Sequence, residues 1–287
     1  MVDLEINQGD IARQLDKFTD EASEFYSNPD NISPIVSITY FFVISLAYLF
    51  LQIFIIVNSK THQEIDNVKT HKLYLFGYCM LILLGSFLIN YNISKSLCPK
   101  DNINMYTLIL NTLFPWLFIF GSIYGILIVF ETWHRPFSNT IGYFVIKILG
   151  IEKLFEDILH KEEELSDDDS NPEKRLNIIQ AILNMKTNNS IFINELDEDQ
   201  ALFDSFITQL GKANIIEEIK DTESDISKKV KEIYKLVVIK NSVGRFVWFV
   251  LAGIIISTVT YNNMINSSCN QSKTSILQAY EDIAKIS

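Results

Sequence analysis

The sequence predicts an all-α, polytopic membrane protein with four transmembrane helices in a 3+1 arrangement and an acidic helical extramembrane insert. Long apolar runs occupy residues 35–57, 73–93, 106–130 and 244–264. No charged residue interrupts the first three runs, and more than one hundred residues separate the third from the fourth. About 20 helical residues cross a hydrocarbon core about 30 Å thick. Backbone polar groups cannot stay unpaired in lipid, so each run must be a helix.

The composition divides the 287 residues into five segments. They are a polar acidic N-terminal segment (1–34), a three-helix transmembrane bundle (35–131), an acidic helical domain (132–243), a fourth transmembrane helix (244–265) and an amphipathic C-terminal tail (266–287). The net charge of −11 is concentrated in the first and third segments, which carry 8 acids against 2 bases and 21 against 14. Since sequence-independent nucleic-acid binding requires clustered Lys and Arg, nucleic acid is not an expected partner.

The distribution of Lys and Arg predicts the orientation in the membrane. The side that holds residues 58–72 and 132–243 has nine of these residues near span boundaries, and the side with both termini has three. Cytoplasmic loops carry the excess of positive charge. We therefore expect residues 132–243 to be cytoplasmic and both termini to be lumenal or exterior.

Two cysteines share the predicted lumenal side. Cys98 lies between the second and third spans, Cys269 follows the fourth span, and Cys79 lies inside the second span. In an oxidising lumen, a Cys98–Cys269 disulfide would join the fourth span to the three-helix bundle. Two free thiols are the alternative.

Small residues in the third and fourth spans predict close helix packing. Gly121 and Gly125 are four residues apart, and Gly253 and Ser257 repeat that spacing. Such pairs let a second helix approach closely. Packing within the chain and assembly into an oligomer are both compatible with the pattern. A ligand or ion site is the less favoured alternative, because such sites usually contain an intramembrane charge or a broken helix.

A cluster of aromatic and cationic residues follows the third span and predicts an interfacial anchor in the headgroup layer. Its members are Trp133, His134, Arg135, Phe137 and Tyr143. Ser138 or Asn139 is then expected to cap a helix that runs to about His160. This helix either lies on the membrane surface or packs within the insert.

Three more helices are expected in the insert. One begins at Asn171 and Pro172 and ends in a turn at residues 186–190. The next is capped by Asp197 or Asp199 and stops at Gly211. The last begins near Asp225 and continues without a break into the fourth span.

The residues give no positive indication of catalysis, a cofactor or a metal site. The four histidines do not form zinc-binding patterns, and an acidic stretch at 167–171 lacks the Gly and Glu of a calcium loop. His134 with Arg135 is the one pair that an enzyme acting on lipid could use, and anchoring explains it better. We therefore do not expect an enzyme.

The stretch ETWHRPFSNTIGYF resembles a segment of hydrophobic membrane proteins of large nucleocytoplasmic DNA viruses. The resemblance is carried by Trp133, Pro136, Phe137, Ser138, Asn139, Thr140, Gly142 and Tyr143. It implies a virion inner-membrane protein or a minor capsid component.

The favoured function is that of a structural, anchoring membrane protein. Its partners would be the lipid bilayer and other membrane or coat proteins, which would bind through the acidic insert. The alternative is an oligomeric channel or transporter subunit. Gln52, Asn90 and Asn111 are the strongly polar residues of the first three spans that a permeation pathway would use.

Overall fold

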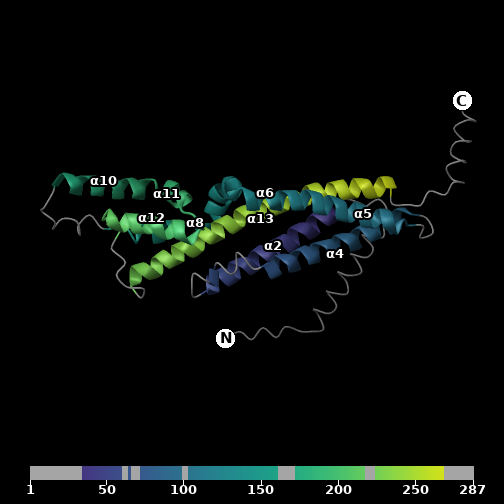
Figure 1. The fold of residues 1–287 in the computed structure, drawn as a ribbon, viewed down its shortest axis with the longest axis horizontal. Coiled ribbons are helices and arrows are strands. Elements are labelled where there is room, and N and C mark those ends of the chain that lie inside the picture. Colours follow the sequence, from purple (N-terminus) through teal and green to yellow (C-terminus); the bar gives the residue numbers. More distant parts are fainter. Residues whose placement is uncertain are drawn as a thin grey trace, which may run out of the picture. The chain divides into compact units, whose positions relative to one another are not determined.

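The computed structural model describes residues 34–59, 64–65, 72–98, 103–160, 172–216 and 224–267. In these ranges the secondary structure is helical, apart from isolated bridge residues such as the antiparallel Leu159–Ile216 pair. Four helices are long and apolar enough to cross a membrane, three near the N-terminus and one near the C-terminal end (Figure 1). The predicted all-α fold class with four spans is confirmed.

The first two spans are α2 (Ile35–Asn58) and α4 (Lys72–Leu97). The third consists of α5 (Met105–Pro115), the π-helical segment η3 (Trp116–Phe120) and α6 (Gly121–Val129). Pro115 has no backbone N–H to donate to the preceding turn, and the wider π-helix follows it directly. The fourth span lies in α13 (Asp225–Ser267), which is one helix of 43 residues. The predicted unbroken helix from the insert into the fourth span is therefore confirmed.

Large apolar side chains are exposed along the spans. Phe50 is 60% exposed, Leu84 is 62% exposed and Phe118 is 66% exposed. Water would strongly disfavour so much contiguous apolar surface, whereas lipid accommodates it. Together with the four long apolar helices, this surface identifies a multi-pass integral membrane protein that contacts the bilayer.

The chain divides into two compact units. The first contains Met1–Phe42, Cys79–Ser122 and Ala252–Ser287. Inside it, Ile93, Leu108 and Met264 form a buried apolar cluster. Hydrogen bonds tie its helices together: Tyr40 Oη donates to the Leu81 carbonyl at 2.6 Å, Asn90 Nδ2 donates to Thr112 Oγ1 at 2.9 Å, and Ser94 Oγ donates to Met264 Sδ at 3.5 Å.

The two small-residue motifs have different surroundings. A Cβ added to Gly253 would lie 2.6 Å from Cε1 of Phe41, a ring that is 2% exposed, and Ser257 is also buried. A Cβ on Gly121 or Gly125 would meet no neighbouring atom of the described residues within 4 Å. The Gly253 motif therefore packs inside the chain, whereas the packing role of Gly121 and Gly125 stays a prediction.

We expect Gly253→Ala to lower the free energy of unfolding in detergent by about 1–3 kcal/mol, because the added methyl group overpacks the contact with Phe41. Gly121→Ala is the matched control, since it makes the same change in a helix at a position where the added Cβ would have no described neighbouring atom within 4 Å. It should be neutral or slightly stabilising through helix propensity. Equal losses for the two variants, measured by denaturant titration, would contradict the assignment of the close contact.

The second unit contains Val43–Tyr78 and Ile123–Leu251. Its helical segments beyond the spans are η4 (Glu131–His134), α7 (Arg135–Phe137), η5 (Ser138–Gly142), α8 (Tyr143–Ile148), α9 (Ile151–Glu156), α10 (Pro172–Thr187), α11 (Asn189–Glu195) and α12 (Gln200–Lys212). Helix α12 packs along the first half of α13, with the rings of Phe203 and Tyr234 5.0 Å apart (Figure 1). Both rings belong to one apolar core that also includes Ile146 and Phe155.

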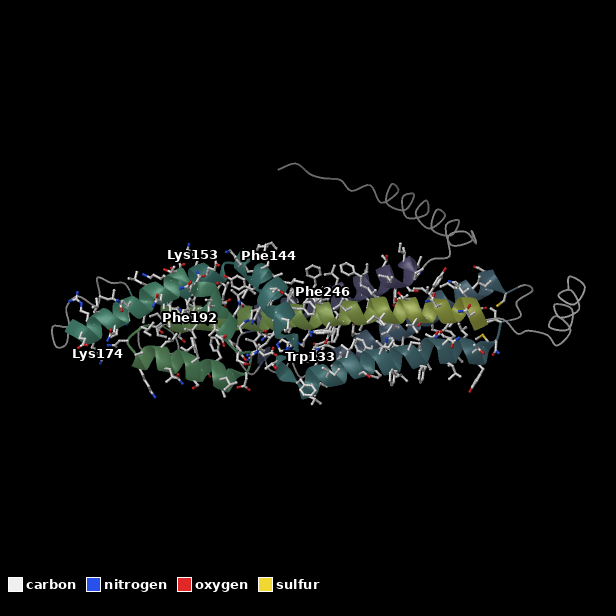
Figure 2. All side chains as sticks on the ribbon, turned by 90° about the horizontal axis from the view of Figure 1, so that it is seen from above. Trp133, Phe144, Lys153, Lys174, Phe192 and Phe246 are labelled. Carbon is white, nitrogen blue, oxygen red and sulfur yellow. The ribbon has the colours of Figure 1, made fainter. Side chains whose placement is uncertain are left out.

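The predicted continuous helix from residue 138 to about 160 is wrong. Gly150 adopts a φ of 90° and separates α8 from α9. The two halves have different surroundings. Ile151 and Phe155 are fully buried in the insert, whereas Phe144 and Ile148 are 63% and 70% exposed. Figure 2 shows the Phe144 side chain on the outside of α8.

The other helix ends in the insert were predicted with mixed success. Asp199 caps α12 as expected, and its side chain accepts a hydrogen bond from the Leu202 N–H at 3.0 Å. Gly211 does not stop that helix, which continues to Lys212; Asn214 instead takes the positive φ, at 55°. The expected turn at 186–190 is reduced to Asn188, because residues on both sides are helical.

Parts of the sequence-based predictions lie outside the described residues. Cys269, the tail beyond residue 267 and residues 1–33 are among them. Cys79 is a free thiol and Cys98 is buried. The Cys98–Cys269 disulfide, the five-segment division and the membrane orientation therefore stay predictions.

Candidate functional site

The segment after the third span crosses α13 at very short range. A Cβ added to Gly142 would collide with the backbone carbonyl oxygen of Lys240. A Cβ added to Gly244 would lie 2.9 Å from Ser138 N and 3.0 Å from His134 O. Glycine fits at both positions because the added Cβ would meet backbone atoms at each, and at Gly244 it would also collide with the Ser138 hydroxyl. Residues 134–142 therefore contact α13 at residues 240–244.

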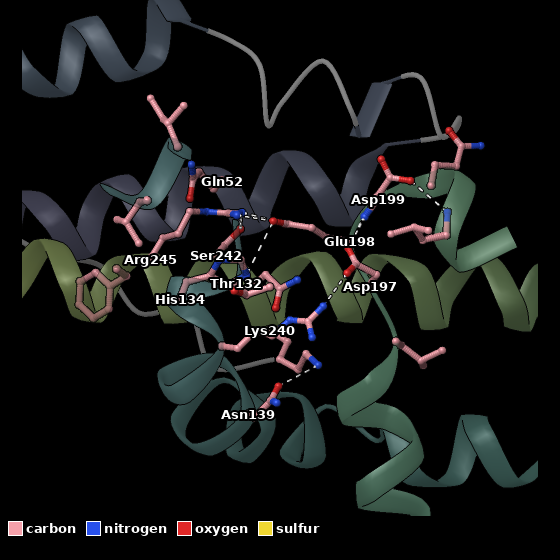
Figure 3. Close-up of a pocket in the computed structure, with 18 of the residues that line it drawn as sticks. Gln52, Thr132, His134, Asn139, Asp197, Glu198, Asp199, Lys240, Ser242 and Arg245 are labelled. Carbon is pink, nitrogen blue, oxygen red and sulfur yellow. Dashed lines mark hydrogen bonds and ion pairs between the residues drawn. The ribbon is translucent and has the colours of Figure 1, made fainter. Parts of the chain in front are cut away.

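Two ion pairs connect this crossing with the loop between α11 and α12. Arg245 forms a bidentate pair with Glu198, with N–O distances of 2.6 and 3.0 Å. Arg135 pairs with Asp197 at 2.9 Å (Figure 3). The Arg245–Glu198 pair is the more buried of the two, since its side chains are 27% and 19% exposed, against 44% and 26%. Bidentate geometry makes it also the stronger pair.

His134 lies inside this network. It is 6% exposed, and its Nε2 atom is 3.9 Å from Glu198 Oε1. Burial lowers the pKa of His134, the nearby Arg245 charge lowers it further, and Glu198 partly opposes the shift. The imidazole is therefore neutral at pH 7, and its contact with Glu198 is not an ion pair.

Lys240 is a cation buried at the crossing. Its side chain precedes the apolar run 244–264 and is 1% exposed. The ammonium nitrogen donates to Asn139 Oδ1 and to the carbonyl oxygens of Ile193 and Asn194, each at 3.3 Å. Burial lowers the pKa of Lys240 to about 8, and repulsion by Arg135 contributes. The group is still mostly protonated at pH 7.

These residues line a cavity of about 1170 Å³ in the second unit (Figure 3). One wall is polar: it contains the cations Arg135, Lys240 and Arg245, the carboxylates Asp197, Glu198, Asp199 and Asp204, and the amides Asn139 and Asn194. The other wall is apolar and consists of side chains from the spanning segments: Leu75, Leu127, Ile128 and Phe249. The cavity therefore offers charge on one side and hydrocarbon on the other.

The predicted anchor residues take part in contacts within the chain. Trp133 is 48% exposed, and its carbonyl oxygen accepts a hydrogen bond from Trp248 Nε1 at 3.2 Å. The ring of Phe137 meets Trp248 edge-on at 5.2 Å. Figure 2 shows the Trp133 side chain on the outside of the ribbon. Contacts within the chain do not test whether these side chains lie in the headgroup layer, so the interfacial anchor stays a prediction.

Tyr143, the last predicted anchor residue, donates a hydrogen bond to the carboxylate of Glu152. Lys147 completes the cluster with a 3.0 Å ion pair to the same carboxylate. Burial and the bond to Glu152 raise the pKa of Tyr143, and the same bond lowers the pKa of Glu152. This cluster links α8 to α9 across the break at Gly150.

Within the described ranges, no group of three or more His, Cys, Asp and Glu side chains could hold a metal ion. Comparison with known proteins adds nothing to this description: no family model, no curated protein and no solved structure matches the chain.

Proposed function

We propose that the protein is a structural, anchoring membrane protein that holds its acidic helical insert in a fixed position for partner proteins. The resemblance of residues 131–144 to viral membrane proteins supports placing it in a virion inner membrane or among minor capsid components. The partner would be a coat or scaffold layer that contacts the insert.

The observation that carries this proposal is the joint at the start of the fourth span. Helix α13 contributes Tyr234 to the core of the insert and continues without a break into the apolar run. The backbone crossing at Gly142 and the Arg245–Glu198 pair lock the insert onto that helix at the same level. A joint with buried charge and backbone contact resists bending, which suits a protein that positions a domain.

Exposed apolar side chains on the insert support a role in binding partners. Leu176 and Leu183 on α10 are 57% and 44% exposed, and Ile191 and Leu202 on the neighbouring helices are each 60% exposed. Leu176 and Leu183 are seven residues apart and so share one face of α10, and an exposed apolar helix face favours a protein contact. The outward Phe144 and Ile148 on α8 support the alternative in which that helix lies against the membrane surface.

Cross-linking mass spectrometry of particles and membranes from the native source tests the proposal. We expect the protein to be enriched in particles, with cross-links from lysines of the insert to a coat protein. Leu176→Ser with Leu183→Ser should abolish these cross-links, because it removes exposed apolar contacts without disturbing the core. Gln180→Ser, at an exposed polar position on the same helix, is the control and should leave them intact. Residence in cellular membranes without such a partner would overturn the proposal.

The channel or transporter alternative has a separate test. Asn90 donates to Thr112 inside the first unit, which favours helix packing, whereas Gln52 lines the cavity. Ion flux is measured on the full chain in vesicles, before and after Gln52→Leu. Flux that depends on Gln52 would favour the alternative and contradict a purely structural role.

A further inference from the structure

The end of η5 together with α8 presents an apolar face on the outside of the insert. Ile141, Phe144 and Ile148 are 45%, 63% and 70% exposed, and their spacing of three and four residues places them on one helix face. The other side of the same segment is buried, with Ile146 in the core of the insert and Gly142 against the Lys240 backbone. The segment is therefore amphipathic, and the fold of the described chain leaves its outward face uncovered.

Two contacts along α13 show the level at which this face lies. The segment meets α13 at Lys240, because a Cβ added to Gly142 would collide with the Lys240 carbonyl oxygen. The end of the first span meets α13 five residues away, where Lys235 Nζ donates to the Val57 carbonyl at 3.0 Å. Five helical residues extend about 8 Å along the axis. The outward face of α8 therefore begins near the level at which α2 ends.

The last turns of α2 carry apolar side chains that the bilayer covers. Phe50, Phe54 and Val57 are 60%, 67% and 54% exposed on a helix that is long and apolar enough to cross a membrane. The buried side of α2 belongs to the same core as α8, since Ile56 and Ile146 share one apolar cluster. The outward face of α8 is thus close in level to an established lipid-facing surface of the same compact unit.

The direction of the segment also fits a membrane surface. Figure 2 shows Trp133 and Phe144 on opposite sides of the α13 ribbon, so the segment that joins them passes across this helix. Lys174 on α10 lies at the end of the insert far from Phe246 in the same view. A helix that crosses a spanning helix near its membrane end is directed toward the plane of the bilayer, as interfacial helices are.

We propose that the outward face of α8, formed by Ile141, Phe144 and Ile148, lies in the interfacial layer of the bilayer that the four spans cross. Burying these side chains at the boundary between headgroups and acyl chains supplies the favourable free energy. The insert then has a second attachment to the membrane besides α13. This contact does not depend on the coat contact proposed for α10, because it uses different residues on a different helix.

Quenching of a fluorescent label by brominated lipid tests the proposal on the full chain in phosphatidylcholine vesicles, with bromine high in the acyl chains. Bimane is attached through Ile148→Cys, through Phe54→Cys as the reference in the first span, and through Leu176→Cys as the matched exposed position on α10. The native chain, labelled in the same way, gives the background from its own cysteines. Because interfacial helices enter about 5–10 Å into the headgroup–acyl boundary, we expect quenching at Ile148→Cys within about twofold of that at Phe54→Cys. Leu176→Cys should stay at the background. Quenching at Ile148→Cys no greater than at Leu176→Cys would overturn the proposal.

Iodide in the aqueous phase distinguishes lipid from a protein partner on this face. We expect iodide to quench the label at Leu176→Cys and to leave the label at Ile148→Cys protected. Protection of Ile148→Cys from both iodide and brominated lipid would overturn the proposal in favour of a protein contact. Phe144→Cys is the second position on the same face and replaces Ile148→Cys if that variant does not fold.

Two double variants separate this contact from the proposed function. Coat cross-links should follow Leu176 and Leu183, so Leu176→Ser with Leu183→Ser should remove them without changing lipid quenching at Ile148→Cys. Loss of lipid quenching at Ile148→Cys in that double variant would contradict an independent membrane contact of α8.

Discussion

Gly142→Ala and Gly244→Ala are each expected to destabilise the protein by about 2 kcal/mol. Alanine gains up to about 1 kcal/mol over glycine in a helix interior, but the added methyl group here meets backbone atoms, and overpacking costs about 1–3 kcal/mol. The Lys240 carbonyl blocks one position, and the Ser138 hydroxyl, Ser138 N and His134 O block the other. Backbone atoms cannot rotate away as side chains do, so we expect an overpacking cost near the upper limit of about 3 kcal/mol. Subtracting the gain of about 1 kcal/mol in helix propensity leaves a net loss of about 2 kcal/mol.

Gly211→Ala is the matched control for this pair. Gly211 also lies in a helix of the second unit, but a Cβ there would meet no neighbouring atom of the described chain within 4 Å. It should be neutral or stabilising by a few tenths of a kcal/mol to about 1 kcal/mol. Denaturant titration in detergent micelles measures all three variants. A stable Gly142→Ala protein would show that the crossing is not tightly packed.

Removing one partner of the Arg245–Glu198 pair should have the largest effect of any charge substitution in the network. Glu198→Gln leaves the Arg245 guanidinium at the start of the apolar run without a counter-charge. Truncating one partner of a buried pair costs about 3–5 kcal/mol. Because these side chains are 27% and 19% exposed, we expect about 3 kcal/mol. The Glu198→Leu, Arg245→Leu double variant should recover much of the loss, since it leaves no unpaired charge.

The Arg135–Asp197 pair is the internal control, because its N–O distance is also short but its side chains are 44% and 26% exposed. Asp197→Asn should cost less than about 1 kcal/mol, as is usual for exposed pairs. A double-mutant cycle for each pair gives the coupling energies. Equal coupling in the two pairs would contradict the greater burial of Arg245 and Glu198.

The span and cap predictions succeeded where local sequence determines the structure. A run such as 35–57 has one outcome in lipid, because an uncharged apolar segment can pair its backbone only as a helix. The cap at Asp199 and the start at Pro172 depend on groups within three residues of each other. The unbroken α13 follows from Val230, Ile233 and Val237 in helical phase, with no proline before the fourth span.

The errors arise where two local signals compete. Gly150 and Gly211 look alike in the sequence, yet Gly150 ends a helix at positive φ and Gly211 lies inside one. Asn214 takes the left-handed conformation near the end of α12 instead. Short β-branched runs and asparagines at 188–193 obscured α11. Packing against the core, not propensity, decides such short helices.

Composition and spacing along the chain established that it is helical, has four helices long and apolar enough to span a membrane, and continues from its insert into the last of them. Each of those properties depends on composition and spacing within about 25 residues. The close approach of Gly142 and Gly244 to neighbouring segments, the pairing of the charges and the position of the cavity depend on the tertiary structure. Glu198 and Arg245 are 47 residues apart, and Asn139 and Lys240 are 101 apart. Their pairing depends on how the insert folds back onto α13, and no local pattern encodes that contact.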